Sequence, residues 1–592
     1  MLGMGLLLLP GCFTPRTADA MRVESMKAVM ENQQATAVGT LNELYESHLT
    51  GEIAEVGGSP TTTDKINAKQ SLLWHMERGL VDHVFGDLLN SNVHLDRAGE
   101  LVDERRTKTL VTEVGTFAAN DTIRDFPGTA FEHTQVDYYR ALNRVLQAEQ
   151  REGIYLPTHI LAPLPPKPNE KRPEPTTLWT LNGNDGVSAA DNYDRAINFS
   201  RRMTINQLQE TKEAAGSNRY NDDPFARFLA ATLTYAPKIG DRAEANRQFA
   251  DVMLKKSMEG YTKQAEILTG KQPFRYEVSR RPETVERMYI RHCRAYDPEA
   301  FERSLSQYGL SATDPRIQNA ALPAGHGSIL VLNHVGYITH PEVLDIRFVA
   351  AQFSGSQSPT PAQAAQGHTS SKFYIGAVAF WATGPGSDVV KTWGALPIPS
   401  DLVQKLIAPG GAAFIGFAIP VHDVDRPILP PGTVRARPAG STSQAGDFAK
   451  PLEVLTDLDA YARATLKDDQ PGVLAKTMIR TAAKQTAVAL ASHEVEKRNK
   501  DKDGVGQLLG LAVNLIGSAA MTFSEVADTR AWTTLPDHIS GTLLDLPAGR
   551  YTLTIDTVLG PVECGGVIVE PGRVVVVPVR TFPEPLRYRS GQ

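Results

Sequence analysis

The spacing of apolar residues changes near Gly325, and this change limits the folds that the chain can adopt. Before it, apolar residues recur at intervals of three and four, as on one face of a helix in the segment 70–101: Leu72, Leu73, Met76, Leu80, Val84 and Leu88. After it, the short apolar runs 326–335, 375–382 and 413–421 stand between turn residues, as buried strands do. We therefore predict an α+β protein.

The predicted helical part covers residues 21–300 and contains two segments that look like antiparallel helix pairs. One is 70–101, and the other is 225–256, where Ala245 and Phe249 stand four residues apart. In tetratricopeptide-type (TPR) hairpins a small residue lets two helices approach, and an aromatic ring fills the next groove. A strict TPR-like repeat and a general array of helical hairpins both fit this pattern. A proline-rich insertion at 157–176 interrupts the array, because its prolines exclude helix.

Two further regions follow the helices. Residues 320–525 mix strand and helix signals and predict a mixed α/β domain. Residues 535–585 alternate like strands between the turns Pro547-Ala-Gly549 and Pro571-Gly572, which predicts a small, sandwich-like all-β module.

The apolar stretch Leu508–Met521 lies between these two regions. At 1.5 Å per residue a helix of this length is about 21 Å long, too short to cross a hydrocarbon core of about 30 Å. We predict a buried helix that joins the helical body to the β module. A contact with lipid or with a partner protein is the alternative.

The first twelve residues, MLGMGLLLLPGC, look like a lipoprotein signal peptide that ends at Cys12. A leucine stands three residues before this cysteine and a small residue directly before it, as in a bacterial lipobox. Acylation of Cys12 anchors a protein stably, because each buried CH2 contributes about 0.8 kcal/mol. The alternative is a chance Gly-Cys after an apolar stretch, since no Lys or Arg precedes the run.

This signal predicts a lipid-anchored protein of the bacterial cell envelope. Phe13 and Thr14 follow the cysteine where an Asp-type retention signal would stand, so we expect the outer membrane, with the protein facing the periplasm. The 592 residues carry a net charge of only −6 and no broad basic field, so we expect no nucleic-acid partner.

Two cysteines remain besides Cys12. Cys293 and Cys564 are free or paired with each other, and the sequence leaves both possibilities open. Cys293 stands beside His292, but neighbouring side chains on a helix point about 100° apart, which argues against a catalytic Cys–His dyad.

The chain contains no standard catalytic motif: it has no GxxxxGK[ST], no GxSxG, no HExxH and no CxxC. The nearest candidate is His326, His334 and His340, followed by Glu342 and Asp345. Their spacings of eight and six put the histidines on one strand face only if the strand is very long. We therefore expect no catalytic residue, no metal and no cofactor. The alternative is an envelope hydrolase or metal-dependent enzyme that uses this histidine region.

The segment Ala527–Pro536, ADTRAWTTLP, leads into the LPAG of residues 546–549. It resembles the ADTR-x-W-x-x-LP … LPAG segment of a family of uncharacterised bacterial envelope lipoproteins with TPR-like N-terminal halves. Further matches follow in the family's order, at residues 137–141, 223–228, 455–460 and 478–484. Genes of this family often lie beside lipoproteins that resemble activators of penicillin-binding proteins. The resemblance therefore implies a role in cell-wall or envelope assembly, and it supplies no catalytic residues.

Three residues of this segment are candidate structural or partner contacts. Asp528 and Arg530 are close enough to pair, and Trp532 can anchor the passage into the β module. We predict a non-catalytic scaffold that binds envelope proteins through an open groove of the helical array, with regulators of peptidoglycan synthesis as the expected partners. A fragment of residues 20–300 should then capture them by itself.

Overall fold

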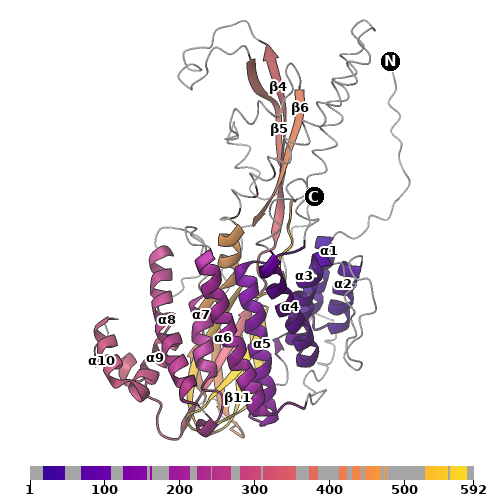
Figure 1. The fold of residues 1–592 in the computed structure, drawn as a ribbon. Coiled ribbons are helices and arrows are strands. Elements are labelled where there is room, and N and C mark those ends of the chain that lie inside the picture. The colour runs from indigo at the N-terminus through magenta and orange to yellow at the C-terminus, as the bar shows by residue number, and fades with distance from the viewer. Residues whose placement is uncertain are drawn as a thin grey trace, which may run out of the picture.

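The computed structural model confirms the α+β class: a layer of helices lies against two five-stranded sheets (Figure 1). The structure describes residues 18–46, 68–108, 125–156, 160–162, 186–213, 223–241, 243–268, 281–307, 311, 313–354, 373–383, 412–422, 430–441, 447–466, 469, 473, 477, 527–557 and 560–582. Cys12, the stretch Leu508–Met521 and most of the proline-rich insertion 157–176 lie outside these residues.

The helices pack mainly on their neighbours along the chain (Figure 1). They are α1 (Ala18–Met30), α2 (Gln34–Glu46), α3 (Ala68–Val84), α4 (Leu88–Lys108), α5 (Ala130–Arg151), α6 (Ala189–Glu213), α7 (Pro224–Leu233), α8 (Glu244–Leu268), α9 (Glu283–Tyr296), α10 (Pro298–Gln307) and the short α11 (Pro315–Gln318), with the 3-10 helix η2 (Ile239–Asp241).

Both predicted helix pairs are present. The pair α3 and α4 matches 70–101, and α7 and α8 match 225–256. Gly86 follows the end of α3 with φ 81°, a left-handed conformation that glycine adopts without strain. A strict TPR repeat stays a prediction. Among the described helices, none is long and apolar enough to cross a bilayer.

The C-terminal strands do not form a sheet of their own. The first five-stranded sheet has the order β1-β12-β11-β7-β8 and the second β2-β13-β3-β10-β9. Their strands are β1 (Tyr155–Leu156), β2 (Leu161–Ala162), β3 (His326–Val335), β7 (Thr433–Pro438), β8 (Phe448–Pro451), β9 (Glu453–Asp457), β10 (His538–Pro547), β11 (Gly549–Thr557), β12 (Gly560–Val569) and β13 (Val574–Thr581).

Strand β3 lies at the centre of the second sheet, antiparallel to β10 and parallel to β13. Strand β11 pairs with β7 in the first sheet. The regions predicted as separate domains, 320–525 and 535–585, therefore share both of these sheets. The two-residue strands β1 and β2 add one edge to each sheet. Strand β1 ends just before the predicted insertion 157–176, and β2 lies within it.

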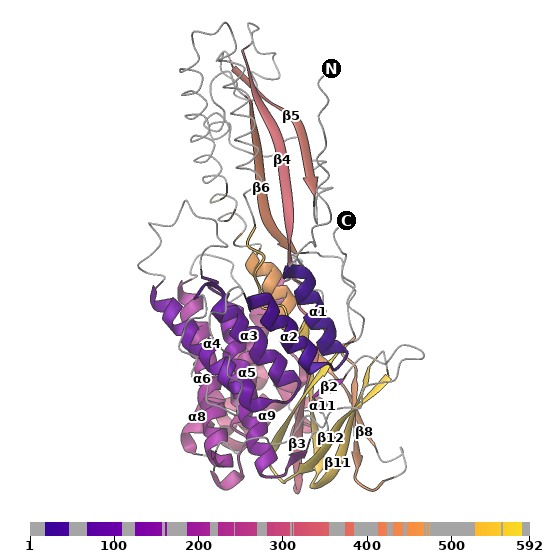
Figure 2. The same cartoon turned by 90° about the vertical axis from the view of Figure 1, so that its right-hand side faces the viewer.

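A third sheet projects from one end of the body (Figure 2). It consists of β4 (Pro341–Ser354), β5 (Phe373–Thr383) and β6 (Ala412–His422) in the antiparallel order β5-β4-β6. The predicted strands 375–382 and 413–421 are therefore confirmed.

The inner face of the helical layer is covered by the chain's own strands. Helix α5 packs on β1 and β13, α7 on β9, and α9 on β10. One cluster of buried apolar residues runs from the helices into both five-stranded sheets. Strands of the same chain therefore cover the inner side of α5, α7 and α9, and partner binding through a groove of the helical array stays a prediction.

Candidate functional site

The segment 527–536 lies between the helices and the second sheet, with hydrogen bonds to α3, α5 and β13. Its predicted ion pair forms: the guanidinium of Arg530 donates to both carboxylate oxygens of Asp528, at 2.8 and 2.7 Å. The Arg530 side chain is 6% exposed and lies over the ring of Phe126, 5.7 Å from its centroid. This pair fixes the turn that brings the chain to Trp532.

Trp532 is buried and anchors the segment, as predicted. Its indole N–H donates to Oγ1 of Thr534 at 3.0 Å, and its backbone N–H donates to Oε1 of Glu132 at 2.8 Å. Arg580 of β13, also buried, donates to the carbonyl of Thr534 at 3.0 Å. Because Trp532 is enclosed by the protein itself, its role here is to hold the fold together, and it is not exposed for a partner.

Three buried glutamates on the helices accept backbone hydrogen bonds from the C-terminal part of the chain, and we call Glu77, Glu132 and Glu149 the glutamate clamp. Glu77 and Glu132 bind the segment 527–536 before β10, and Glu149 binds β13. Glu77 of α3 accepts from the backbone N–H and hydroxyl of Thr533, at 2.7 and 2.8 Å, and from the N–H of Thr534 at 3.2 Å.

In α5, Glu149 accepts from the N–H of Val576 at 2.8 Å. Burial raises the pKa of all three carboxyl groups, while their hydrogen bonds act in the opposite direction.

The sequence shows only part of this clamp. Thr129 and Glu132 form a capping box at the start of α5, a pattern that is visible in the sequence. Glu77 and Glu149 stand on buried helix faces, and nothing local identifies their distant backbone partners. Buried carboxylates need such partners, because an unpaired buried polar group is costly.

The structure does not bring the three histidines of β3 and its flank together. His334 is buried, and its Nε2 accepts from the hydroxyl of Tyr138 at 2.7 Å. Its Nδ1 lies 3.1 Å from the carbonyl of Val579, so these partners assign the proton to Nδ1. Burial lowers its pKa well below the usual value. His334 therefore serves as a neutral core residue.

His326 begins the same strand and contacts the carbonyl of Ala324 at 3.2 Å. Eight residues of extended chain separate it from His334 by about 26 Å. Glu342 and Asp345 are three residues apart on β4, so they belong to opposite faces of that strand. Among the described residues no group of three or more His, Cys, Asp or Glu side chains is arranged to hold a metal ion.

His292 and Cys293 have separate environments. The hydroxyl of Tyr235 lies 2.5 Å from Nδ1 of His292. Cys293 is fully buried, and burial raises its pKa to about 11. Cys564 is also a free, buried thiol, so the two cysteines are not paired with each other. A thiol with a raised pKa is a poor nucleophile, which agrees with the argument against a dyad.

A buried histidine cluster between α3 and α4 was not predicted. Nδ1 of His75 lies 3.1 Å from Nδ1 of His94, and the edge of Trp74 contacts both rings. About two turns further along α3, Nδ1 of His83 contacts Oδ1 of Asn143 at 2.6 Å. Burial lowers the pKa of His75 to about 3 and that of His83 to about 4.

Because His83 is buried in its neutral form, we expect the free energy of unfolding to fall in acid. His83 stays neutral in the folded state down to about pH 4, whereas it takes up a proton near pH 6.5 when unfolded. The unfolded state therefore binds more protons, and stability present above pH 6.5 is lost as the pH falls towards 4. When the pH is lowered from 7 to 4.5, the free energy of unfolding should fall by about 2 kcal/mol less in His83→Gln than in the wild type. Urea unfolding at both pH values measures this, and equal losses in the two proteins would contradict it.

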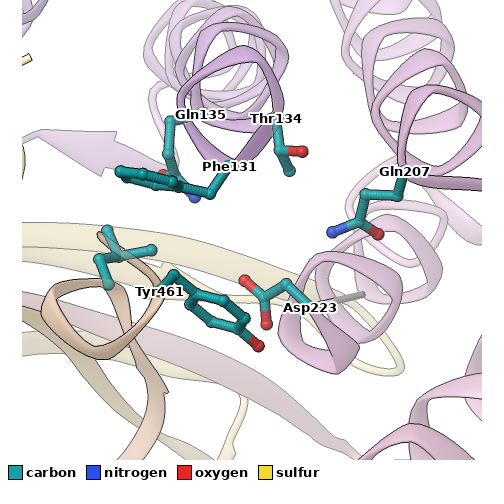
Figure 3. A pocket seen from close by; sticks show the side chains of 7 residues that line it. Phe131, Thr134, Gln135, Gln207, Asp223 and Tyr461 are labelled. Carbon is teal, nitrogen blue, oxygen red and sulfur yellow. The ribbon is translucent and has the colours of Figure 1, made fainter. Parts of the chain in front are cut away.

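One pocket lies where α5, α6 and α7 meet the helical residues 458–466 (Figure 3). Its lining side chains are Phe131, Thr134, Gln135, Gln207, Asp223, Leu458 and Tyr461. Its volume of about 10 Å³ is that of a single water molecule. Asp223 caps α7 through the N–H of Phe225 and accepts from Thr456 at 3.1 Å. These groups therefore connect helix to strand, and the space between them is too small for a substrate.

Comparisons with protein-family models, with curated proteins and with solved structures give no match for this chain.

Proposed function

We propose that this protein is a lipid-anchored scaffold of the bacterial cell envelope that binds other envelope proteins without catalysing a reaction. The observation that carries the proposal is the sequence Leu-Leu-Pro-Gly-Cys at residues 8–12. The resemblance of residues 527–549 to envelope lipoproteins supports it. The internal hydrogen bonds of His334, His292 and Asp223 also support it, because these side chains serve the fold.

The proposal includes an outer-membrane location facing the periplasm and a role in cell-wall or envelope assembly. Regulators of peptidoglycan synthesis are the proposed partners. It also takes the helices as a TPR-like array and the two five-stranded sheets as a sandwich. Since strands cover the inner side of α5, α7 and α9, we place the partner on the outer side of the helical array.

The outer contact between α6 and α8 is the best-supported binding surface. Arg201 of α6 donates to Oδ1 of Asn246 at 2.8 Å and lies over the ring of Phe249 on α8. Beside this contact, Ile205 is 54% and Val252 44% exposed. Exposed aliphatic side chains next to an arginine and a ring are typical of protein-binding surfaces.

Acylation is tested by metabolic labelling with a fatty-acid analogue. The wild type should carry the label and Cys12→Ser should carry none, because only this cysteine follows the lipobox. Cys564→Ser is the matched control and should label like the wild type. Equal labelling of wild type and Cys12→Ser would contradict the anchor.

Partner binding is tested by placing a photocrosslinking residue at position 205 or 252 in living cells. Both positions should capture the same envelope protein. With the crosslinker at position 252, Ile205→Asp should reduce capture of that protein at least fivefold. Phe448, 41% exposed on β8, is the control position and should not capture it. Capture from position 448 alone would move the binding surface to the sheets.

A further inference from the structure

Helices α3 and α4 pack closely at the point where two buried histidines meet. A Cβ atom at Gly79 of α3 would lie 2.7 Å from Cγ of Leu95 on α4, so a side chain at this position would displace Leu95. The hydroxyl of Ser91 donates to the carbonyl of Gly79 at 2.7 Å and fixes the spacing of the two helices. His75 stands one turn before Gly79, and His94 directly before Leu95. The packing of the two helices therefore brings the two imidazoles together.

The two imidazoles face each other through the same atom. Nδ1 of His75 lies 3.1 Å from Nδ1 of His94. Trp74 packs edge-on against both rings, with centroid distances of 4.7 Å to His75 and 5.0 Å to His94. A hydrogen bond between the two Nδ1 atoms uses one N–H and one lone pair, so the neutral rings are opposite tautomers. Both Nδ1 atoms therefore point into the same gap.

Burial keeps both rings neutral. His75 is 6% and His94 8% exposed. Desolvation lowers the pKa of His75 to about 3 and that of His94 well below its usual value. The positive charges of Arg97 and Arg78 act in the same direction on His75 and His94, respectively. Because the neutral imidazole is the form that binds metal ions, the pair offers two nitrogen donors at neutral pH.

The number of donors and the nearby charges select the kind of ion. Structural zinc sites use four donors. Among the described residues, however, no group of three or more His, Cys, Asp or Glu side chains is arranged to hold a metal ion. A doubly charged ion is also disfavoured, because Arg78 and Arg97 are the charged groups that act on the pair. Cu⁺ carries one charge, accepts two donors in a line and binds imidazole.

We propose that His75 and His94 form a two-coordinate site for Cu⁺, with Nδ1 of each imidazole as a ligand. This inference depends neither on the lipid anchor nor on the partner surface proposed above. Entry of the ion replaces the hydrogen bond between the two Nδ1 atoms by two N–Cu bonds. The one Nδ1 proton moves through water to Nε2 of the same ring. Both rings stay neutral, no proton is released and copper keeps its charge.

The site must open slightly to take the ion. With metal–nitrogen distances of about 2 Å, a linear arrangement places the two Nδ1 atoms about 4 Å apart. They are 3.1 Å apart in the structure, so the imidazoles have to separate by about 1 Å.

The test measures Cu⁺ binding to the full-length Cys12→Ser protein without oxygen, in competition with the chelator bicinchoninate. His94→Met and His94→Leu form a matched pair of similar volume, but only methionine has a thioether that binds Cu⁺. Loss of one of two donors in His94→Leu should weaken binding at least about 100-fold, whereas His94→Met should stay within about tenfold of the parent. Binding to the buried thiols of Cys293 and Cys564 is measured in the same titration, because it remains in His94→Leu.

His83→Gln is the control for a buried histidine on the same helix. Nδ1 of His83 contacts Oδ1 of Asn143 and takes no part in the pair, so this variant should bind Cu⁺ like the parent.

X-ray absorption spectroscopy identifies the atoms bound to the ion. The parent protein with one equivalent of Cu⁺ should show two nitrogen neighbours and no sulfur, and His94→Met should show one of each. The measurement on the parent decides the question even if the variants do not fold. Sulfur neighbours in the parent would assign the ion to a cysteine and overturn the proposal. Equal Cu⁺ binding by folded His94→Met and His94→Leu, or no binding by the parent, would also overturn it, and the histidine pair would then be a hydrogen bond of the core only.

Discussion

A fragment of residues 18–307, which contains every helix up to α10, should not fold by itself. Its inner helices bury their apolar faces against strands that the fragment lacks, and one core cluster includes residues of both. Without those strands, Tyr139, Val145 and Phe225 become accessible to water. We expect weak near-UV circular dichroism, binding of the hydrophobic dye ANS and a non-cooperative urea transition.

The full-length Cys12→Ser protein is the control and should unfold cooperatively. Co-expression of 18–307 with 313–592 should restore the near-UV spectrum, because the second piece supplies β3, β10 and β13. Cooperative unfolding of 18–307 alone would contradict this expectation and would show that the helices form an independent domain. The capture predicted for a fragment of residues 20–300 should therefore be measured with the full-length protein.

Local patterns in the sequence predict local structure well in this chain. The change of spacing near Gly325 marks the start of β3 at His326. The two predicted helix pairs, 70–101 and 225–256, correspond to α3 with α4 and to α7 with α8. These predictions depend on neighbouring residues alone, and helix and turn signals act over the same short range.

Pairing between distant strands could not be predicted in the same way. Val576 of β13 lies beside Leu330 of β3, and Leu553 of β11 lies beside Ala436 of β7. All four are short apolar residues without a local signal for a particular partner strand. The strands of 535–585 were therefore assigned to one module, although they are distributed over two sheets with strands from the central region.

In the segment 527–536, too, a contact between neighbours in the sequence could be predicted and a contact between distant residues could not. Asp528 and Arg530 are two positions apart, and their pairing could be predicted from that spacing. Glu77 binds Thr533, which is 456 residues away along the chain, and only the folded structure brings them together. Both groups are polar, so apolar periodicity carries no information about their contact.

Replacement of Glu77 by alanine should lower the free energy of unfolding by about 3–5 kcal/mol. The change removes the carboxylate that accepts hydrogen bonds from three buried donors. These donors are the N–H and hydroxyl of Thr533 and the N–H of Thr534. Glu77→Gln keeps one acceptor oxygen but turns an amide donor towards another donor, so its cost should be about 1–2 kcal/mol. Urea unfolding of the unlipidated protein measures both values.

Glu100→Ala is the matched control, because this glutamate forms an exposed ion pair with Arg97 on α4. Its effect should stay within about 0.5 kcal/mol. A double-mutant cycle of Glu77→Ala with Thr533→Val should give a coupling of more than about 1 kcal/mol, since the two side chains share a hydrogen bond. If Glu77→Ala were as stable as Glu100→Ala, the hydrogen bonds of Glu77 would not hold α3 to the segment 527–536. Helix packing alone would then have to account for the buried position of Trp532.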